Sequence, residues 1–452
     1  MNRAFRILLL GAFGFGLFSP TARALPAELN LESALQYALE NAPSFDSARR
    51  TRVYRDLEYK NAVVNFLPSL DLKAVQGLQN NIPLSSNNNT ATVITPNSTA
   101  PWFSSLNLGL TETFYDNGQS ITGLQVADLG EKLAEISFLK SRDALSLELA
   151  SEYYRYSLYS QLLEVRKQQH AILARQFATL SSQYQQGFKT REDYLRIKSQ
   201  LKRSGIESIS AENRRVQSAV TLQKILGFSR AAEEAPQFTP LAVQTERVES
   251  QLSLPQAPVL ENTFDYRLRK VQSEINDRSV DLVKRQYWPQ ISLTGGITYT
   301  NGNYINSNTP VFGVNDQFNY NALLTIQYNF WDWGLRRRNV QIAEYKRDIQ
   351  DNELNVTALE TRASVGALML DVSRVKQNYR LTQELLEMET ETYRGLEEKY
   401  RDGKVAYIDL ITELNNLLDA KVQFYTIYFD LLQNAAKYHF YEGKLYDWLI
   451  QK

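Results

Sequence analysis

The overall composition narrows the functions open to this chain before any motif is considered. The chain has 452 residues, no cysteine, two histidines and a formal net charge of zero at neutral pH. A neutral chain without a basic patch is not drawn to nucleic acid by its charge, and two isolated histidines make no zinc site. Phosphate-binding loops and nucleophile elbows are absent from the sequence. We therefore expect no nucleic-acid partner, metal, cofactor or catalysis, and interpret His170 and His439 as packing or surface residues.

The N-terminal segment has the features of an export signal. Two arginines precede an apolar run over residues 7–18, and Ala22 and Ala24 supply the small side chains that signal peptidase requires. We expect a signal peptide over residues 1–24. A membrane anchor is the alternative, but the run is shorter than the roughly 20 residues that cross a bilayer as a helix. Because the chain has no cysteine, it is not expected to be lipidated.

A doubled pattern follows the export signal. The segment Phe-Tyr-Asp-Asn-Gly at residues 114–118 recurs 216 positions later as Phe-Trp-Asp-Trp-Gly at residues 330–334. Four further landmarks recur at the same offset: Tyr184 with Tyr400, Gly187 with Gly403, Asp193 with Asp409, and Gly227 with Gly443. Such periodicity indicates one structural unit used twice. We expect a first repeat over residues 25–240, a linker over residues 241–258 and a second repeat over residues 259–452.

Each repeat begins with two segments in which apolar and polar side chains alternate. After Pro289, Ile291 and Leu293 alternate with Ser292 and Thr294, and a period of two indicates a strand. We expect four strands, over about residues 68–79, 102–115, 289–300 and 318–331. Small membrane barrels need about eight strands, so these strands would close a barrel only with those of other chains. A soluble sandwich is the alternative.

Aromatic residues gather near the expected strand ends, where membrane barrels carry a girdle at the interface between lipid and water. The candidates for this position are Trp102, Tyr115, Trp331 and Trp333. A basic triplet at residues 336–338 follows, at the expected junction of strand and helix. We interpret the triplet as a solvated helix start, with contact to anionic groups at the membrane surface as the alternative.

The sequence changes to a helical period after each pair of strands. Residues 119–184 and 335–400 contain no proline, and Leu145, Leu149 and Tyr156 follow the spacing of a coiled-coil seam. A glycine then stops each long helix in a left-handed conformation, and a shorter helix returns. We expect helical hairpins over about residues 119–227 and 335–443.

Together these motifs resemble the TolC-like outer-membrane efflux family. The resemblance is carried by a helix start at residues 29–35, aromatic-Leu/Trp-Pro before a strand, aromatic-Asp-x-Gly at a strand end and Tyr-x2-Gly-x5-Asp at a hairpin tip. It implies a mainly α fold with a membrane β-barrel part. A homotrimer would form a 12-stranded β-barrel in the outer membrane and a 12-helix α-barrel in the periplasm. The linker and the residues after Gly443 would form a belt around the helices.

The resemblance implies a passive exit duct. In a tripartite efflux or type I secretion system, an inner-membrane transporter and a periplasmic adaptor protein deliver substrate to such a duct and largely decide the cargo. The adaptor would dock at the hairpin tips, formed by Gly187, Phe188, Gly403 and Lys404. A periplasmic coiled-coil scaffold without channel activity is the alternative function. A free-standing porin is disfavoured, because porins have many strands per chain and no long helices.

In the family, aspartates, a tyrosine and an arginine narrow the periplasmic entrance. By motif position the resemblance assigns this aperture to Asp193, Tyr400 and Asp409, whereas Val405 and Thr412 stand where the arginine and a further aspartate are expected. Three copies of each aspartate would make acidic rings that favour cations. The alternative is local, since an aspartate six residues after a turn glycine can cap a helix or favour its dipole.

Overall fold

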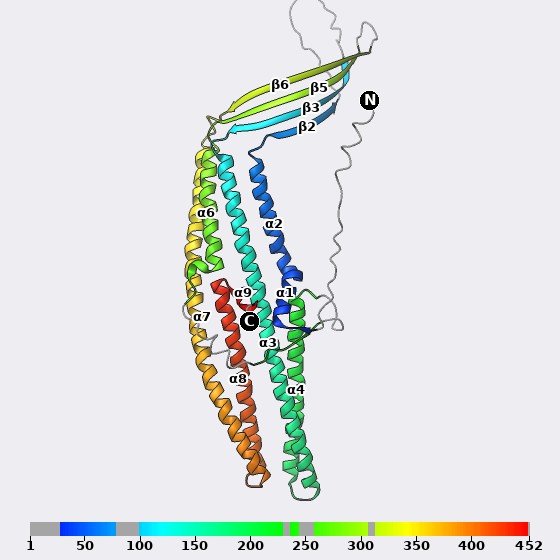
Figure 1. Cartoon of the computed structure of the whole chain (residues 1–452), viewed down its shortest axis with the longest axis vertical. Coiled ribbons are helices and arrows are strands. Elements are labelled where there is room, and N and C mark those ends of the chain that lie inside the picture. The colour runs from blue at the N-terminus through cyan, green and yellow to red at the C-terminus, as the bar shows by residue number, and fades with distance from the viewer. Residues whose placement is uncertain (1–27, 78–98, 229–235, 244–256, 306–311, 451–452) are drawn as a thin grey trace, which may run out of the picture.

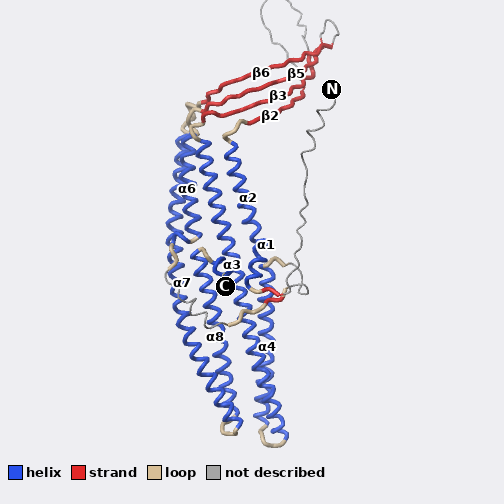
Figure 2. The backbone as a smooth tube through the Cα atoms, viewed as in Figure 1, coloured by secondary structure: helices blue, strands red, loops and turns tan. Residues whose placement is uncertain are grey.

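The structure is a computed structural model that describes residues 28–77, 99–228, 236–243, 257–305 and 312–450. The expected signal peptide over residues 1–24 and most of the expected linker lie outside the described residues. Figure 1 shows an elongated molecule with a sheet at one end and two helical turns at the other. Helices fill the length between them (Figure 2).

Two long helices run along most of the molecule. Helices α3 (Gln119–Gln185) and α7 (Leu335–Arg401) have 67 residues each, which at 1.5 Å per residue is a length of about 100 Å. Helix α4 (Arg191–Ile225) returns along α3, and helix α8 (Tyr407–Glu442) returns along α7. The two hairpins that the helical period predicts are therefore present (Figure 1).

Two helices that the sequence analysis did not predict lie beside the strand-proximal parts of the long helices. Helix α2 (Pro43–Val64) packs on α3, and helix α6 (Phe264–Arg285) packs on both α3 and α7. The end of α4 meets the start of α2 at Gly227, where an added Cβ would lie 2.9 Å from Cδ of Pro43. The end of α8 meets the segment before α6 in the same way at Gly443. Each long helix is thus flanked by two shorter helices stacked end to end.

The sheet joins two pairs of strands that are far apart in the sequence. Strands β2 (Ser69–Gly77), β3 (Thr99–Tyr115), β5 (Gln290–Ile305) and β6 (Phe312–Gln327) lie in the order β2-β3-β5-β6, and every neighbouring pair is antiparallel. Strands β2 and β6 are the two edges of this sheet. Strand β6 ends at Gln327, earlier than the expected residue 331, because its partner β5 begins at Gln290, which pairs with Gln327.

Short strands and helices form a layer at the middle of the long helices, which we call the middle layer. Strand β1 (Glu28–Leu29) pairs in parallel with β4 (Gln237–Phe238). Helices α1 (Leu31–Asn41) and α9 (Leu445–Ile450) pack on α3, and a short 3₁₀ helix, η1 (Leu260–Asn262), precedes α6. Helices α1 and α9, which lie near the two ends of the described chain, are therefore at the same level of the molecule (Figure 1).

Buried tyrosines of α3 hold this middle layer. The hydroxyl of Tyr153 lies 3.0 Å from the carbonyl oxygen of Leu29 and 2.5 Å from that of Thr239. The hydroxyl of Tyr156 donates to the carbonyl oxygen of Phe238 over 3.0 Å. The Leu29 carbonyl oxygen also accepts a hydrogen bond from the N–H of Thr239 over 3.1 Å. The tyrosine hydroxyls therefore attach the β1–β4 pair to α3. The main hydrophobic core lies at this level, and α1, α3, α4, α8 and α9 all contribute to it.

A smaller hydrophobic core lies nearer the hairpin turns and joins the two hairpins. Leu173 and Leu180 of α3 pack there with Ile197 of α4 and with Ile411 and Leu414 of α8. The apolar side chains of these helices are thus used to pack one helix against another. Within the described ranges, no helix is both long enough and apolar enough to span a lipid bilayer.

Candidate functional site

Both hairpin turns have the same backbone geometry. Gly187 and Gly403 have φ angles of 81° and 72°. The N–H of Phe188 donates to the carbonyl oxygen of Gln183 over 2.9 Å, and the N–H of Lys404 donates to that of Lys399 over 2.9 Å. This pattern is the Schellman motif, which needs a left-handed residue after the helix. The tip glycines are therefore explained by the turn itself.

The side chains at the two tips differ in chemistry. Phe188 on the first tip is 76% exposed. On the second tip, Lys404 Nζ lies 2.9 Å from Asp402 Oδ2, and both side chains are exposed. The first tip thus presents a solvent-exposed aromatic ring, whereas the second presents a solvent-exposed ion pair.

Asp193 and Asp409 occupy equivalent positions in the first turns of α4 and α8. The N-cap of α4 is Thr190, whose Oγ1 accepts a hydrogen bond from the N–H of Asp193 over 3.2 Å. The N-cap of α8 is Ala406, which has no capping side chain. Neither carboxylate is therefore the helix cap, and both lie where the helix dipole favours negative charge. Asp409 is exposed and Asp193 is half-buried.

Tyr400 is the first member of a series of contacts that runs from the second hairpin to the first. Its ring centroid lies 6.2 Å from that of Tyr407, at the start of α8. The Tyr407 hydroxyl donates to Oε1 of Gln176 on α3 over 3.3 Å. Burial raises the pKa of both tyrosines, which therefore stay neutral. No sequence motif identifies Tyr407 or Gln176, because their contact spans two hairpins.

A pair of carboxyl groups lies between α7 and α8 above the second tip. Hydrogen bonding with the Glu413 carboxyl group favours the protonated form of Glu389 and raises its pKa. Glu413 Oε2 also lies 3.3 Å from the Nδ2 donor of Asn416. One of the two carboxyl groups must carry a proton for the shared bond to form. This pair was also missed in the sequence, because its members lie on different helices.

The aromatic-Asp-x-Gly motif is a helix start with two consecutive left-handed residues. Asn117 and Gly118 have φ angles of 56° and 78°, and Trp333 and Gly334 have φ angles of 55° and 78°. Asp116 accepts hydrogen bonds from the N–H groups of Gly118 and Ser120 over 2.9 and 2.6 Å. Asp332 accepts equivalent bonds from Gly334 and Arg336 over 3.1 and 2.9 Å. The aspartate therefore satisfies the free N–H groups of the first helical turn.

The candidate interface aromatics lie at opposite ends of the strands. Tyr115 ends β3 at the helical side, and Trp331 and Trp333 lie in the segment between β6 and α7. These two tryptophans are exposed, and their ring centroids are 5.6 Å apart in an edge-to-face arrangement. Trp102 lies at the other end of β3, where its backbone pairs with Asn303. Its side chain is outside the described part of the chain.

The two faces of the sheet have opposite character. One row across the four strands contains exposed apolar side chains: Leu72, Leu108, Ile297 and Tyr320. The next row, on the other face, contains polar side chains: Lys73, Asn107, Thr298 and Asn319. Within the polar row, Asn107 Nδ2 donates to Thr298 Oγ1 over 2.5 Å. An exposed apolar sheet face of this size needs a partner or a lipid environment.

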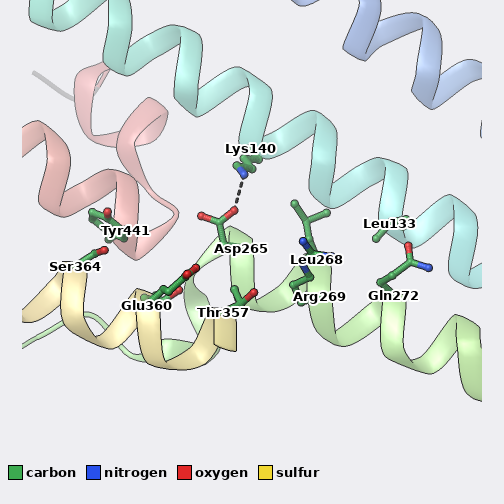
Figure 3. Close-up of a pocket in the computed structure, with 11 residues that line it drawn as sticks. Leu133, Lys140, Asp265, Leu268, Arg269, Gln272, Thr357, Glu360, Ser364 and Tyr441 are labelled. Atoms are coloured by element: carbon green, nitrogen blue, oxygen red, sulfur yellow. Dashed lines mark hydrogen bonds and ion pairs between the residues drawn. The ribbon is translucent and has the colours of Figure 1, made fainter. Parts of the chain in front are cut away.

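A cavity of about 480 Å³ lies where α3, α6, α7 and the end of α8 meet. Figure 3 shows two of its lining residues, Lys140 and Asp265, pointing toward each other, with Nζ and Oδ1 2.5 Å apart. A second lining residue, Arg269, pairs with Glu353 over 2.7 Å. These ion pairs tie α6 to both long helices. We interpret the cavity as a packing gap in the helical wall, since its charged side chains serve to join helices.

The two histidines have local partners. Nδ1 of His170 lies 2.9 Å from Oγ of Ser204, and the ring of His439 stacks on Trp448 with centroids 4.6 Å apart. In the described part of the chain, no three histidine, aspartate or glutamate side chains gather as a metal site would require.

The sequence matches the family described as outer membrane efflux protein over residues 34–228 and 259–437. The chain belongs to this family. Its members are outer-membrane efflux channels, which are transport proteins and not enzymes. A comparison with curated protein sequences found no match.

Solved structures of outer-membrane proteins share the fold. CusC, studied for its folding and transmembrane channel formation, has a TM-score of 0.71 and 14% identity, with 91% of this chain and 92% of that chain covered. VceC from Vibrio cholerae has a TM-score of 0.70 and 15% identity, with 91% and 96% covered. The CmeC outer-membrane channel of Campylobacter jejuni has a TM-score of 0.71 and 14% identity, with 92% and 86% covered.

Proposed function

We propose that three copies of this chain form one exit duct, in which their strands make a single barrel in the outer membrane. The observation that carries the proposal is the sheet, with an exposed apolar face, a polar face and two edges at β2 and β6. Strand edges in lipid must be paired, and β6 of one copy can pair with β2 of the next. The apolar face would then meet lipid and the polar face would line water.

The helical part would continue the duct through the periplasm. Helix α7 carries exposed apolar side chains at helical spacing, among them Ile342, Tyr345, Ile349 and Val356. Helix α4 carries another exposed apolar set, which includes Ile206, Ile209, Val216 and Val220. Exposed apolar stripes of this kind are suited to packing helices of neighbouring copies. We assign them to contacts between subunits of the trimer.

The hairpin tips would close the duct and receive its partners. Phe188 and Lys404 present the side chains for a periplasmic adaptor, which connects the duct to an inner-membrane transporter. Asp193, Tyr400 and Asp409 would line the aperture. The contact from Tyr400 through Tyr407 to Gln176 supports this assignment, because it couples the second tip to the first hairpin. The tandem repeats over residues 25–240 and 259–452, after a cleaved signal peptide, are part of the same proposal.

The oligomeric state in detergent and the conductance in a lipid bilayer test this function. Protein extracted from outer membranes should migrate as a trimer that resists detergent, and should produce stepwise ion currents in a planar bilayer. A soluble monomer without conductance would instead support the periplasmic scaffold.

A further inference from the structure

We propose that Trp331, Trp333, Arg337 and Arg338 form a binding surface for the phosphate group of a membrane lipid. We call these four residues the Trp-Arg surface. The inference rests on the proposed function, because it assumes that the sheet is embedded in lipid. It adds a specific ligand class, an anionic headgroup phosphate, at a defined place on the chain.

The position of the Trp-Arg surface fits the boundary of a bilayer. It lies between the end of β6 and the first turn of α7, where the sheet meets the helices in Figure 1. Above it the sheet carries its exposed apolar face. Tryptophan prefers the headgroup level of a membrane, because its ring is apolar and its N–H is polar. Trp331 and Trp333 are 64% and 81% exposed in the single chain.

The three arginines of the basic triplet have different roles. Arg336 is occupied within the fold: its Nε lies 3.2 Å from Asp332 Oδ2, and its guanidinium carbon lies 5.4 Å from the ring of Tyr287. Arg338 donates to the carbonyl oxygen of Trp333 over 3.1 Å but has no carboxylate partner among the described residues. Arg337 is exposed and makes no ion pair within the described part of the chain. In the single chain, two guanidinium groups close in sequence to the tryptophans therefore have no carboxylate partner among the described residues.

A solvated helix start explains this composition poorly. Positive charges in the first turn oppose the helix dipole, and adjacent arginines repel each other. The first turn of α7 contains no acidic residue to offset them. The corresponding junction before α3 folds in the same way with Asn117, Ile121 and Thr122 at the matching positions. The backbone turn thus does not require these arginines, and a phosphate would supply the missing negative charge.

Phosphate chemistry matches the side chains that are present. A guanidinium group offers parallel N–H donors that fit two phosphate oxygens, and its charge strengthens each bond. The neighbouring tryptophans would pack against the glycerol and acyl part of the same lipid. A free phosphate ion would use the arginines but leave both indole rings in water. We therefore assign the surface to a lipid and not to free phosphate.

The experiment measures lipid binding to the purified full-length trimer. Phosphatidylglycerol is titrated into delipidated protein and bound lipids are counted by native mass spectrometry. Arg337→Gln with Arg338→Gln should lower the affinity roughly 30-fold, because each arginine near an anionic membrane surface contributes about a fivefold factor and the two factors multiply. Trp333→Asn, which keeps a residue that tolerates the left-handed backbone, should lower it several-fold. Arg362→Gln with Arg380→Gln, exposed positions farther along α7, should leave it unchanged.

Three outcomes would overturn the inference. The first is equal phosphatidylglycerol binding by wild type and by the Arg337 and Arg338 double variant. The second is an equal loss in the Arg362 and Arg380 control. The third is that inorganic phosphate displaces all bound lipid, and does so as effectively from wild type as from Trp333→Asn. That result would identify a site for a free anion. Trimer formation and conductance of wild type are measured in parallel, so that a failure of the duct is separated from a failure of the lipid site.

Discussion

The carboxyl groups of this chain show how neighbouring atoms decide the charge of a residue. Burial opposes the charged form of Asp116, but hydrogen bonds from Ser120, Gly118 and Gln119 together outweigh it, and the pKa of Asp116 is lowered. The pKa of Glu389 is raised, chiefly by its hydrogen bond to Glu413. The ionised form is therefore favoured at Asp116, which starts a helix, and the protonated form is favoured at Glu389, which lies between two helices.

The shared proton of Glu389 and Glu413 predicts a pH dependence of the second hairpin. Between the ordinary value of 4.5 and the raised pKa, folded Glu389 binds more protons than unfolded Glu389. Stability from this pair is therefore present at low pH and lost as the pH rises through the raised pKa. Hydrogen exchange of the α7 and α8 amides should show this loss. Glu389→Gln, which donates at any pH, should remove it, whereas exposed Glu384→Gln should not. The same pH profile in Glu389→Gln would contradict the assignment.

The aperture aspartates give a second prediction for single residues. Asp193→Ala combined with Asp409→Ala should raise single-channel conductance and reduce cation preference, because rings of negative charge would be lost from the proposed constriction. Both quantities are measured in a planar bilayer with a salt gradient. Glu192→Ala, next to Asp193 on α4, serves as the control for a general loss of charge. Unchanged conductance and selectivity in the double variant would remove these residues from the constriction.

Several helices end at a glycine with a positive φ angle. The space around these glycines differs from one helix end to another. Gly187 and Gly227 both end helices with positive φ angles, 81° and 84°. An added Cβ meets nothing within 4 Å at Gly187, but at Gly227 it lies 2.9 Å from Pro43 Cδ and 3.3 Å from the carbonyl oxygen of Asn41. The junction of α4 with α2 is therefore closely packed, whereas the hairpin tip is open.

This difference predicts the stability of two matched variants. Gly187→Ala should cost about 1–2 kcal/mol, the strain of a left-handed residue with a Cβ. Gly227→Ala should carry the same strain and an additional packing cost of at least about 1 kcal/mol. Denaturant unfolding of the purified protein, followed by circular dichroism, gives both values. Equal losses in the two variants would show that α4 and α2 do not press on each other.

The periodicity of apolar side chains predicted the strands and the two long helices. It did not predict the contacts between residues that are far apart in the sequence. Alternating side chains located the strands, and the absence of proline located α3 and α7. Helix α2 was missed because Phe45 is its only buried residue in the structure, so its sequence shows almost no apolar stripe. The tip glycines and aspartates could be placed by their spacing. Tyr407, Gln176 and the glutamate pair could not, since only the folded hairpins bring them together.

At the scale of the whole molecule, the exposed apolar surface is the reason to propose a trimer. Exposed leucine, isoleucine and tyrosine side chains cover one face of the sheet and stripes of α4 and α7. A single chain would leave these stripes in water, at a cost of about 25 cal/mol for each Å² of apolar area. The proposed trimer would bury the helical stripes and give the sheet to lipid.

A single added charge tests whether the exposed apolar stripe of α7 forms a subunit contact. Ile349→Glu should prevent trimer formation, because a carboxylate buried between helices without a partner is strongly unfavourable. Asn355→Glu, an exposed position on the same helix that lies about a quarter turn from this stripe, should leave the trimer intact. Native gels and mass photometry of detergent-solubilised protein report the oligomeric state. A stable trimer with Ile349→Glu would place the subunit contact elsewhere.

The end-to-end stacking of the short helices has a mechanical consequence. Each hairpin is one long helix with a second helix that is interrupted halfway, at Gly227 or Gly443. The 35 residues of α4 below this break form a lever arm of about 50 Å. A tilt of about one degree at the break would displace the tip by about 1 Å. A small tilt at the break therefore produces a larger displacement at the hairpin tip, where the proposed aperture would open or close.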